Sequence, residues 1–163
     1  MDLLEAKSRI AEALVESIFR RARYRIDSFP ARQMPLRFGR EDFSPDFVAT
    51  LDDDALVGER VVHVEVKYRP SIPQFISVEN QRGDRSVFLM MRRQWPSLYF
   101  VLVTDRPEPG RSCFQVISFA DIRSNEPFST VDLDQLKELH IFRNNVEDHE
   151  ELLRRIMSLL AGA

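Results

Sequence analysis

Two carboxylates and a lysine are spaced so that they could hold a metal ion and act on a phosphate. Asp46 opens one apolar run, and Glu65 and Lys67 lie two positions apart in a second. Hard divalent cations prefer oxygen ligands such as carboxylates, and the backbone carbonyl of Val66 could supply another. A lysine beside such an ion can position or deprotonate a water, or balance charge on a phosphate. These are the parts needed to hydrolyse a phosphodiester bond.

The two runs predict a pair of β-strands joined by a polar connection. They cover residues 46–51 and 61–67, and the break between them holds three consecutive aspartates at 52–54 and Gly58. Because side chains alternate between the faces of a strand, Glu65 and Lys67 share one face with His63, and three valines share the other. The sequence therefore predicts a carboxylate and an ammonium on one face of the second strand, with Asp46 on its neighbour.

The two short motifs resemble those of the PD-(D/E)xK nucleases, the restriction-endonuclease-like superfamily. They are Pro45-Asp46 and Glu65-Val66-Lys67, with 19 positions between Asp46 and Glu65. The resemblance implies an α/β fold with a restriction-endonuclease-like mixed β-sheet flanked by helices. It also implies a Mg²⁺ or Mn²⁺ cofactor and DNA as the substrate. Asp46, Glu65 and Val66 would then hold the metal, and Lys67 would assist the attacking water.

A helix expected over residues 2–23 offers a further acidic residue. On a wheel of about 100° per residue, Glu12 lies closer to the apolar stripe than Glu16 does. Glu12 also precedes Tyr24 by 12 positions, which is similar to the Holliday-junction-resolvase branch of the superfamily. That resemblance implies that Glu12 assists a metal ligand or a second ion. The alternative is that Glu12 is an ordinary solvated carboxylate.

Basic residues are concentrated ahead of the proposed metal site. The net charge is −3, yet residues 1–40 carry nine Lys and Arg against five Asp and Glu. The segment 30–44 is expected to form a long loop beside Asp46, and long loops in compact domains are often functional. Its arginines, Arg32, Arg37 and Arg40, are candidates for contacting nucleic acid. Ordinary solubility is the alternative for each of them.

The remaining pattern predicts one α/β domain over residues 1–163. Asp84 is expected to cap a helix that ends before Pro96. Strands are expected over 98–103 and 113–119, a short helix around 134–139, and a final helix that Asn145 caps and that runs to Leu160. Residues 74–81 give no clear pattern.

Other classes of protein are disfavoured by what the sequence lacks. It has no phosphate-binding GxxxxGK loop, its three histidines lack zinc spacing, and Cys113 is the single cysteine. No apolar run approaches the length of a membrane span, and residues 1–5 do not resemble a signal peptide, so a cytoplasmic location is expected.

The sequence favours a metal-dependent DNA endonuclease, acting as a homodimer if it cuts both strands. Two alternatives stay open. The chain could be a non-catalytic module on the same fold that binds nucleic acid or protein. Glu65 and Lys67 could instead be the solvated face of an ordinary strand. The roles of His63 and Gln81 also stay open.

Overall fold

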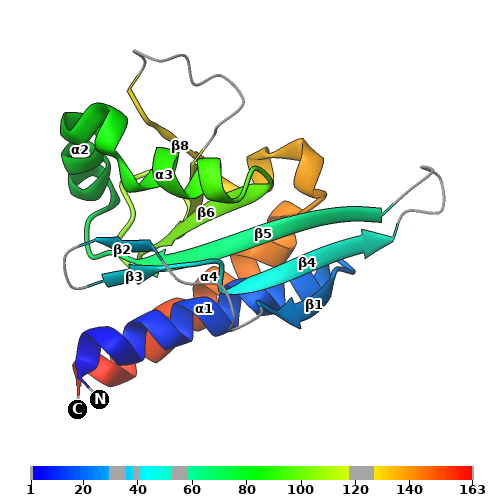
Figure 1. Cartoon of the computed structure of the whole chain (residues 1–163). Helices are drawn as coiled ribbons and strands as arrows, with labels where there is room; N and C mark the ends of the chain where they lie inside the picture. Colours follow the sequence, from blue (N-terminus) through cyan, green and yellow to red (C-terminus); the bar gives the residue numbers. More distant parts are fainter. Residues whose placement is uncertain (1, 30–35, 39–40, 53–58, 118–126, 163) are drawn as a thin grey trace.

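A six-stranded mixed sheet forms the centre of the computed structural model (Figure 1). The structure describes residues 2–29, 36–38, 41–52, 59–117 and 127–162. The sheet has the order β1-β4-β5-β6-β7-β8, formed by Arg25–Ser28, Phe47–Asp52, Glu59–Tyr68, Leu98–Val103, Phe114–Ile117 and Thr130–Asp132. Within the described residues four α-helices flank it: α1 Leu3–Arg21, α2 Ile72–Arg82, α3 Val87–Gln94 and α4 Arg143–Ala161. The predicted mixed α/β class is confirmed.

The sheet is antiparallel except where β5 meets β6. Val64 pairs with Tyr99 and Val66 with Val101 in this parallel step. Parallel neighbours need a long crossover, and here α2 and α3 supply it. β6 is buried along nearly its whole length, as its unbroken apolar sequence predicts for a strand covered on both faces.

Helices α1 and α4 form the layer on one face of the sheet (Figure 1). Asp2 caps α1 by accepting a hydrogen bond from the Glu5 amide at 2.7 Å. Further along α1, Ser17 Oγ lies 2.8 Å from His149 Nε2 of α4. This contact joins α1 to α4, and α1 packs on the valine face of β5.

The predicted cap of α4 is wrong. The helix begins at Arg143 after Phe142, and Asn145 lies within its first turn. The Asn145 amide is buried and donates to the Ile18 carbonyl of α1 at 3.0 Å. Asn145 therefore ties the two helices together instead of capping one of them.

Helices α2 and α3 cover the opposite face of the sheet (Figure 1). Segment 74–81 belongs to α2, which Ser71 caps. The predicted cap of α3 is also wrong, because Ser86, not Asp84, accepts from the Phe88 amide, at 3.2 Å. The Glu79 carboxylate also stabilises the start of α3, because it accepts hydrogen bonds from Ser86 Oγ and from the Val87 amide.

The expected loop 30–44 contains two short antiparallel strands. These are β2 Leu36–Phe38 and β3 Glu41–Phe43. Arg37 falls in β2, opposite Asp42, whereas Arg32 and Arg40 lie outside the described residues. None of the helices in the described part of the chain has the length and apolar character needed to cross a bilayer.

Candidate active site

Asp46 lies at the point where β4 begins and continues the pairing with β5. The strand β4 starts at Phe47, opposite Val64. The Asp46 amide donates to the Val64 carbonyl at 2.7 Å, and its carboxylate accepts from the Val66 amide at 2.7 Å. The Asp46 carboxylate thus accepts the hydrogen bond that a backbone carbonyl of β4 would otherwise accept. Pro45, which has no amide hydrogen, directly precedes it and suits the end of a ladder.

The Val66 carbonyl is directed toward the same edge. In an antiparallel pair, the amide and carbonyl of one residue point to the same neighbouring strand. The Val66 amide meets Asp46, and β4 has no residue paired with Val66. The carbonyl is therefore placed on the Asp46 side of β5, where it could serve as an oxygen ligand.

Glu65 is buried with its charge-bearing atoms unsatisfied. Its exposed fraction is 1%, and neither carboxylate oxygen makes a hydrogen bond of ordinary geometry, although Asp46 and the Ser44 amide lie close enough to act on its pKa. Lys67 Nζ lies 3.8 Å from Glu65 Oε1, which is an ion pair but too long for a hydrogen bond. Buried carboxylate oxygens are costly unless they are paired. Within the described part of the chain, Glu65 is therefore the carboxylate that a bound cation would stabilise most directly.

Glu12 of α1 joins this group, whereas Glu16 does not. The negative charge of Asp46 acts on Glu12, and Lys67 and Arg9 act on it in the opposite sense. Glu16 instead bonds Arg20 at 2.7 Å, one helical turn away on the surface. The helical wheel distinguishes the two glutamates correctly, and three carboxylates and Lys67 come together from α1, β4 and β5.

The pKa values of the three carboxyl groups are all raised. For Glu65, burial raises the pKa well above its usual range, and the Asp46 charge adds to this. Burial also raises the pKa of Asp46, against the opposing effects of its hydrogen bonds and of Lys67. Burial and the Asp46 charge raise the pKa of Glu12 to about 7. The nearby cationic side chains do not offset the effect of burial on these carboxyl groups, whereas a bound divalent cation would favour their charged forms.

Two neighbours of this group were not singled out as site residues by the sequence patterns. The ring of Phe43 lies beneath Lys67, with Nζ 4.6 Å from the ring centroid. Such a contact attracts the ammonium to the face of the ring. The charge of Arg9, in the previous turn of α1, also acts on Glu12, while its guanidinium pairs with Glu5 at 3.6 Å. The spacing of Arg9 and Glu12 on one helix could have identified the second neighbour, but Phe43 is brought in by β3.

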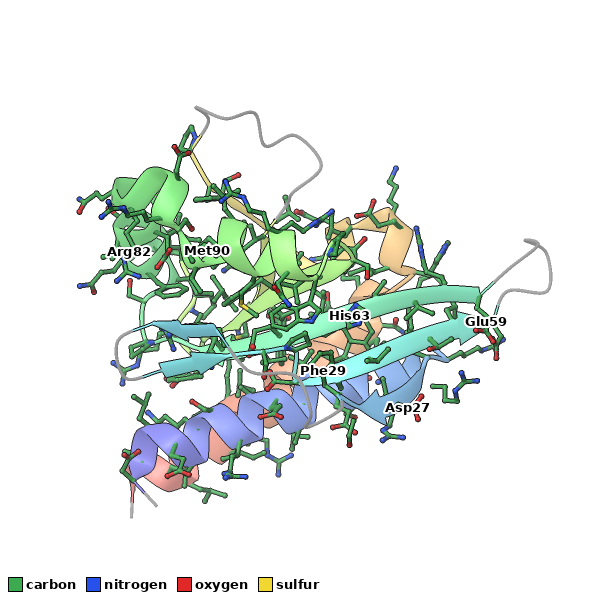
Figure 2. All side chains as sticks on the ribbon, viewed as in Figure 1. Asp27, Phe29, Glu59, His63, Arg82 and Met90 are labelled. Atoms are coloured by element: carbon green, nitrogen blue, oxygen red, sulfur yellow. The ribbon has the colours of Figure 1, made fainter. Side chains whose placement is uncertain are left out.

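His63 lies further along the same face of β5, away from the carboxylates. Its ring meets Phe29 edge-on, with centroids 5.8 Å apart, and Nδ1 lies 2.9 Å from Ser97 Oγ (Figure 2). These contacts give His63 a packing role. Gln81 is exposed on α2. Neither residue joins the carboxylate group.

The residues at this edge fit a hard divalent cation. Asp46, Glu65 and the Val66 carbonyl supply oxygen ligands. A cation bound there would give the two Glu65 oxygens a partner. Across the described residues no group of three or more His, Cys, Asp or Glu side chains is placed so that it could hold a metal ion. A site here would depend on two carboxylates, a backbone carbonyl and waters, as Mg²⁺ often does.

The raised pKa of Glu12 predicts a pH-dependent stability. Between its ordinary value of 4.5 and about 7, folded Glu12 keeps a proton that the unfolded chain has lost. The unfolded state then binds fewer protons, so this group's contribution to stability falls as pH rises through that window. Without metal, Glu12→Gln should match the parent near pH 4.5 and exceed it by about 1–2 kcal/mol above pH 7, after allowance for partial solvent screening.

Urea unfolding in EDTA at a series of pH values measures this difference. Glu16→Gln is the matched control, since Glu16 lies one turn further on α1 and pairs with Arg20 at the surface. A constant difference between Glu12→Gln and the parent across the whole pH range would contradict the raised pKa of Glu12.

Comparison of the chain with models of protein families, with curated proteins and with solved structures finds no match.

Proposed function

We propose that this protein is a metal-dependent endodeoxyribonuclease built on a restriction-endonuclease-like fold. The observation that carries the proposal is the buried Glu65 carboxylate, which has two unpartnered oxygens beside Asp46 and Lys67. An ordinary solvated strand face would leave Glu65 in water, and here its exposed fraction is 1%. A carboxylate that is buried without donors is expected where a cation completes its surroundings.

Each residue has a distinct part in this proposal. Asp46, Glu65 and the Val66 carbonyl hold Mg²⁺ or Mn²⁺. When bound, the metal supplies Lewis acidity and a water of lowered pKa. Lys67, held over Phe43 and 3.8 Å from Glu65, orients the attacking water or balances charge on the phosphate. Glu12 acts through Asp46, so it is a positioning residue that sets the charge of that carboxylate.

The substrate is DNA, and the arginines Arg32, Arg37 and Arg40 are candidates for contacting its backbone. Two copies related by a twofold axis would bring two such sites to the two strands of a duplex, and such dimers are the commonest assembly. Phosphate contacts by arginine would make the binding salt-dependent.

Incubation with DNA tests the proposal directly. The purified protein should nick or cut at least one of linear, nicked, single-stranded and branched DNA when Mg²⁺ or Mn²⁺ is present, and none of them in EDTA. Salt-dependent binding without cleavage in either metal would instead select the non-catalytic binding module. Cleavage that persists in EDTA would overturn the metal-dependent mechanism.

A further inference from the structure

A pocket of about 350 Å³ opens beside the candidate active site. Phe43 and Arg69 form the wall nearest the site, and the segment from Pro70 to Arg82, which includes α2, forms the rest. Its volume lies in the range of small-molecule sites in proteins. Figure 2 shows Arg82 on α2, on the side of the sheet that α3 also covers.

The pocket combines flat apolar surfaces with positive charge. The Arg69 guanidinium stacks on the Phe75 ring, with Cζ 4.4 Å from the centroid. The Arg69 side chain also donates to the Tyr68 carbonyl at 2.9 Å, which holds the guanidinium in place. Guanidinium planes and aromatic rings are the surfaces on which unpaired nucleobases stack.

The acidic side chain in the pocket wall is already neutralised. Glu79 is buried, and its Oε1 lies 3.2 Å from Arg82 Nη1. Its other oxygen accepts from Ser86 and Val87. The pocket therefore presents no uncompensated carboxylate that would repel a phosphate.

The pocket shares a wall with the proposed reaction site. The Lys67 ammonium lies over the ring of Phe43, and Phe43 also lines the pocket. Arg69 follows Lys67 by two residues, so the two side chains leave the same face of the chain. Their Cα atoms are about 6.6 Å apart at about 3.3 Å per residue. A nucleotide next to a phosphate held at Lys67 is within reach of this pocket.

We propose that this pocket binds one unstacked nucleotide of the DNA strand next to the scissile phosphate, with its base against Phe75, Arg69 and Phe43. This inference rests on the proposed function. It identifies the preferred substrate class as DNA with an unpaired nucleotide, such as a gap, a frayed end or a branch, because an unpaired base is the least costly to unstack.

Equilibrium binding in EDTA tests the pocket without cleavage. Fluorescence anisotropy should show that a gapped duplex binds about tenfold more tightly than the fully paired duplex. Phe75→Leu keeps apolar volume against Phe88 and removes the ring, and Arg69→Gln removes the stacked cation. Each should remove most of the preference for the gap, and Phe75→Leu, which changes no charge, should leave binding of the paired duplex unchanged.

A change in the DNA provides a test that does not depend on variant folding. An abasic position is placed in turn at each unpaired nucleotide opposite the gap. At one of these positions it should weaken binding as much as Phe75→Leu does, and combining it with Phe75→Leu should cause no further weakening. Phe142→Leu, at an exposed phenylalanine outside the pocket, is the control and should bind as the parent does.

The outcomes separate this inference from the nuclease proposal. Equal binding of gapped, abasic and paired DNA by the parent overturns the pocket assignment, even if metal-dependent cleavage is observed. Ring-dependent gap binding without cleavage supports the pocket and overturns the nuclease. Absence of binding to any of the DNAs overturns the pocket assignment as well.

Discussion

Replacing Lys67 by alanine should lower the rate of Mg²⁺-dependent DNA cleavage by a factor of about 10²–10⁴. The ammonium lies 3.8 Å from Glu65 and is held over Phe43, so its loss removes the only lysine that the described structure places at the site. DNA binding should weaken much less than turnover, because binding draws on many contacts. Single-turnover cleavage and anisotropy on the same substrate measure the two effects separately.

Lys67→Met distinguishes chemistry from packing. It keeps the stem that lies along Phe43 and removes the charge, and it should lose activity as fully as Lys67→Ala. Lys137→Ala, at an exposed lysine, is the control for a simple change of charge and should cut at the parental rate. Parental turnover by Lys67→Met would remove Lys67 from the mechanism.

Replacing Glu65 by glutamine should separate stability from metal binding. In EDTA near pH 8, the variant should be at least as stable as the parent, with a gain of up to about 2 kcal/mol, because a buried carboxylate of raised pKa costs most when pH is high. The parent should gain about 1.4 kcal/mol from Mg²⁺ at ten times its dissociation constant. That corresponds to a few degrees in Tm, and the variant should lose this response.

Glu151→Gln is the matched control for this substitution. Glu151 is exposed on α4, so the same chemical change there should leave both the EDTA melting curve and the Mg²⁺ response unaltered. The assignment of Glu65 as a ligand fails if Glu65→Gln melts with the parental magnesium shift.

The placement of the candidate site residues could be predicted from local spacing, because it depends on strand alternation. The period of two in 61–68 puts Glu65 and Lys67 on one face, and that face is where they lie. The hairpin pairing then brings Asp46 alongside Val64 and Val66. The choice of Glu12 over Glu16 needed only the helical period. These are short-range regularities that one sequence carries in full.

The features that were missed depend on contacts between distant segments. Asn145 looks like a helix cap until α1 offers it the Ile18 carbonyl. Asp84 looks like the cap of α3, but the buried Glu79 and Ser86 arrange that turn. Phe43 reaches Lys67 because β3 lies beside the end of β5, which no local pattern indicates. Tertiary contacts overrode local preference in each case.

The pairing of α1 with α4 has a consequence for the order in which the chain folds. The Ser17–His149 contact joins residues 132 positions apart, and the parallel β5–β6 step also needs a long crossover. Such non-local contacts form slowly, since a large loop must close before they contribute. Helix α1 also packs on β5, so both the sheet and α4 place Glu12 beside Asp46. The layer that holds Glu12 is completed by a contact between two distant parts of the chain, and we expect it to form late in folding.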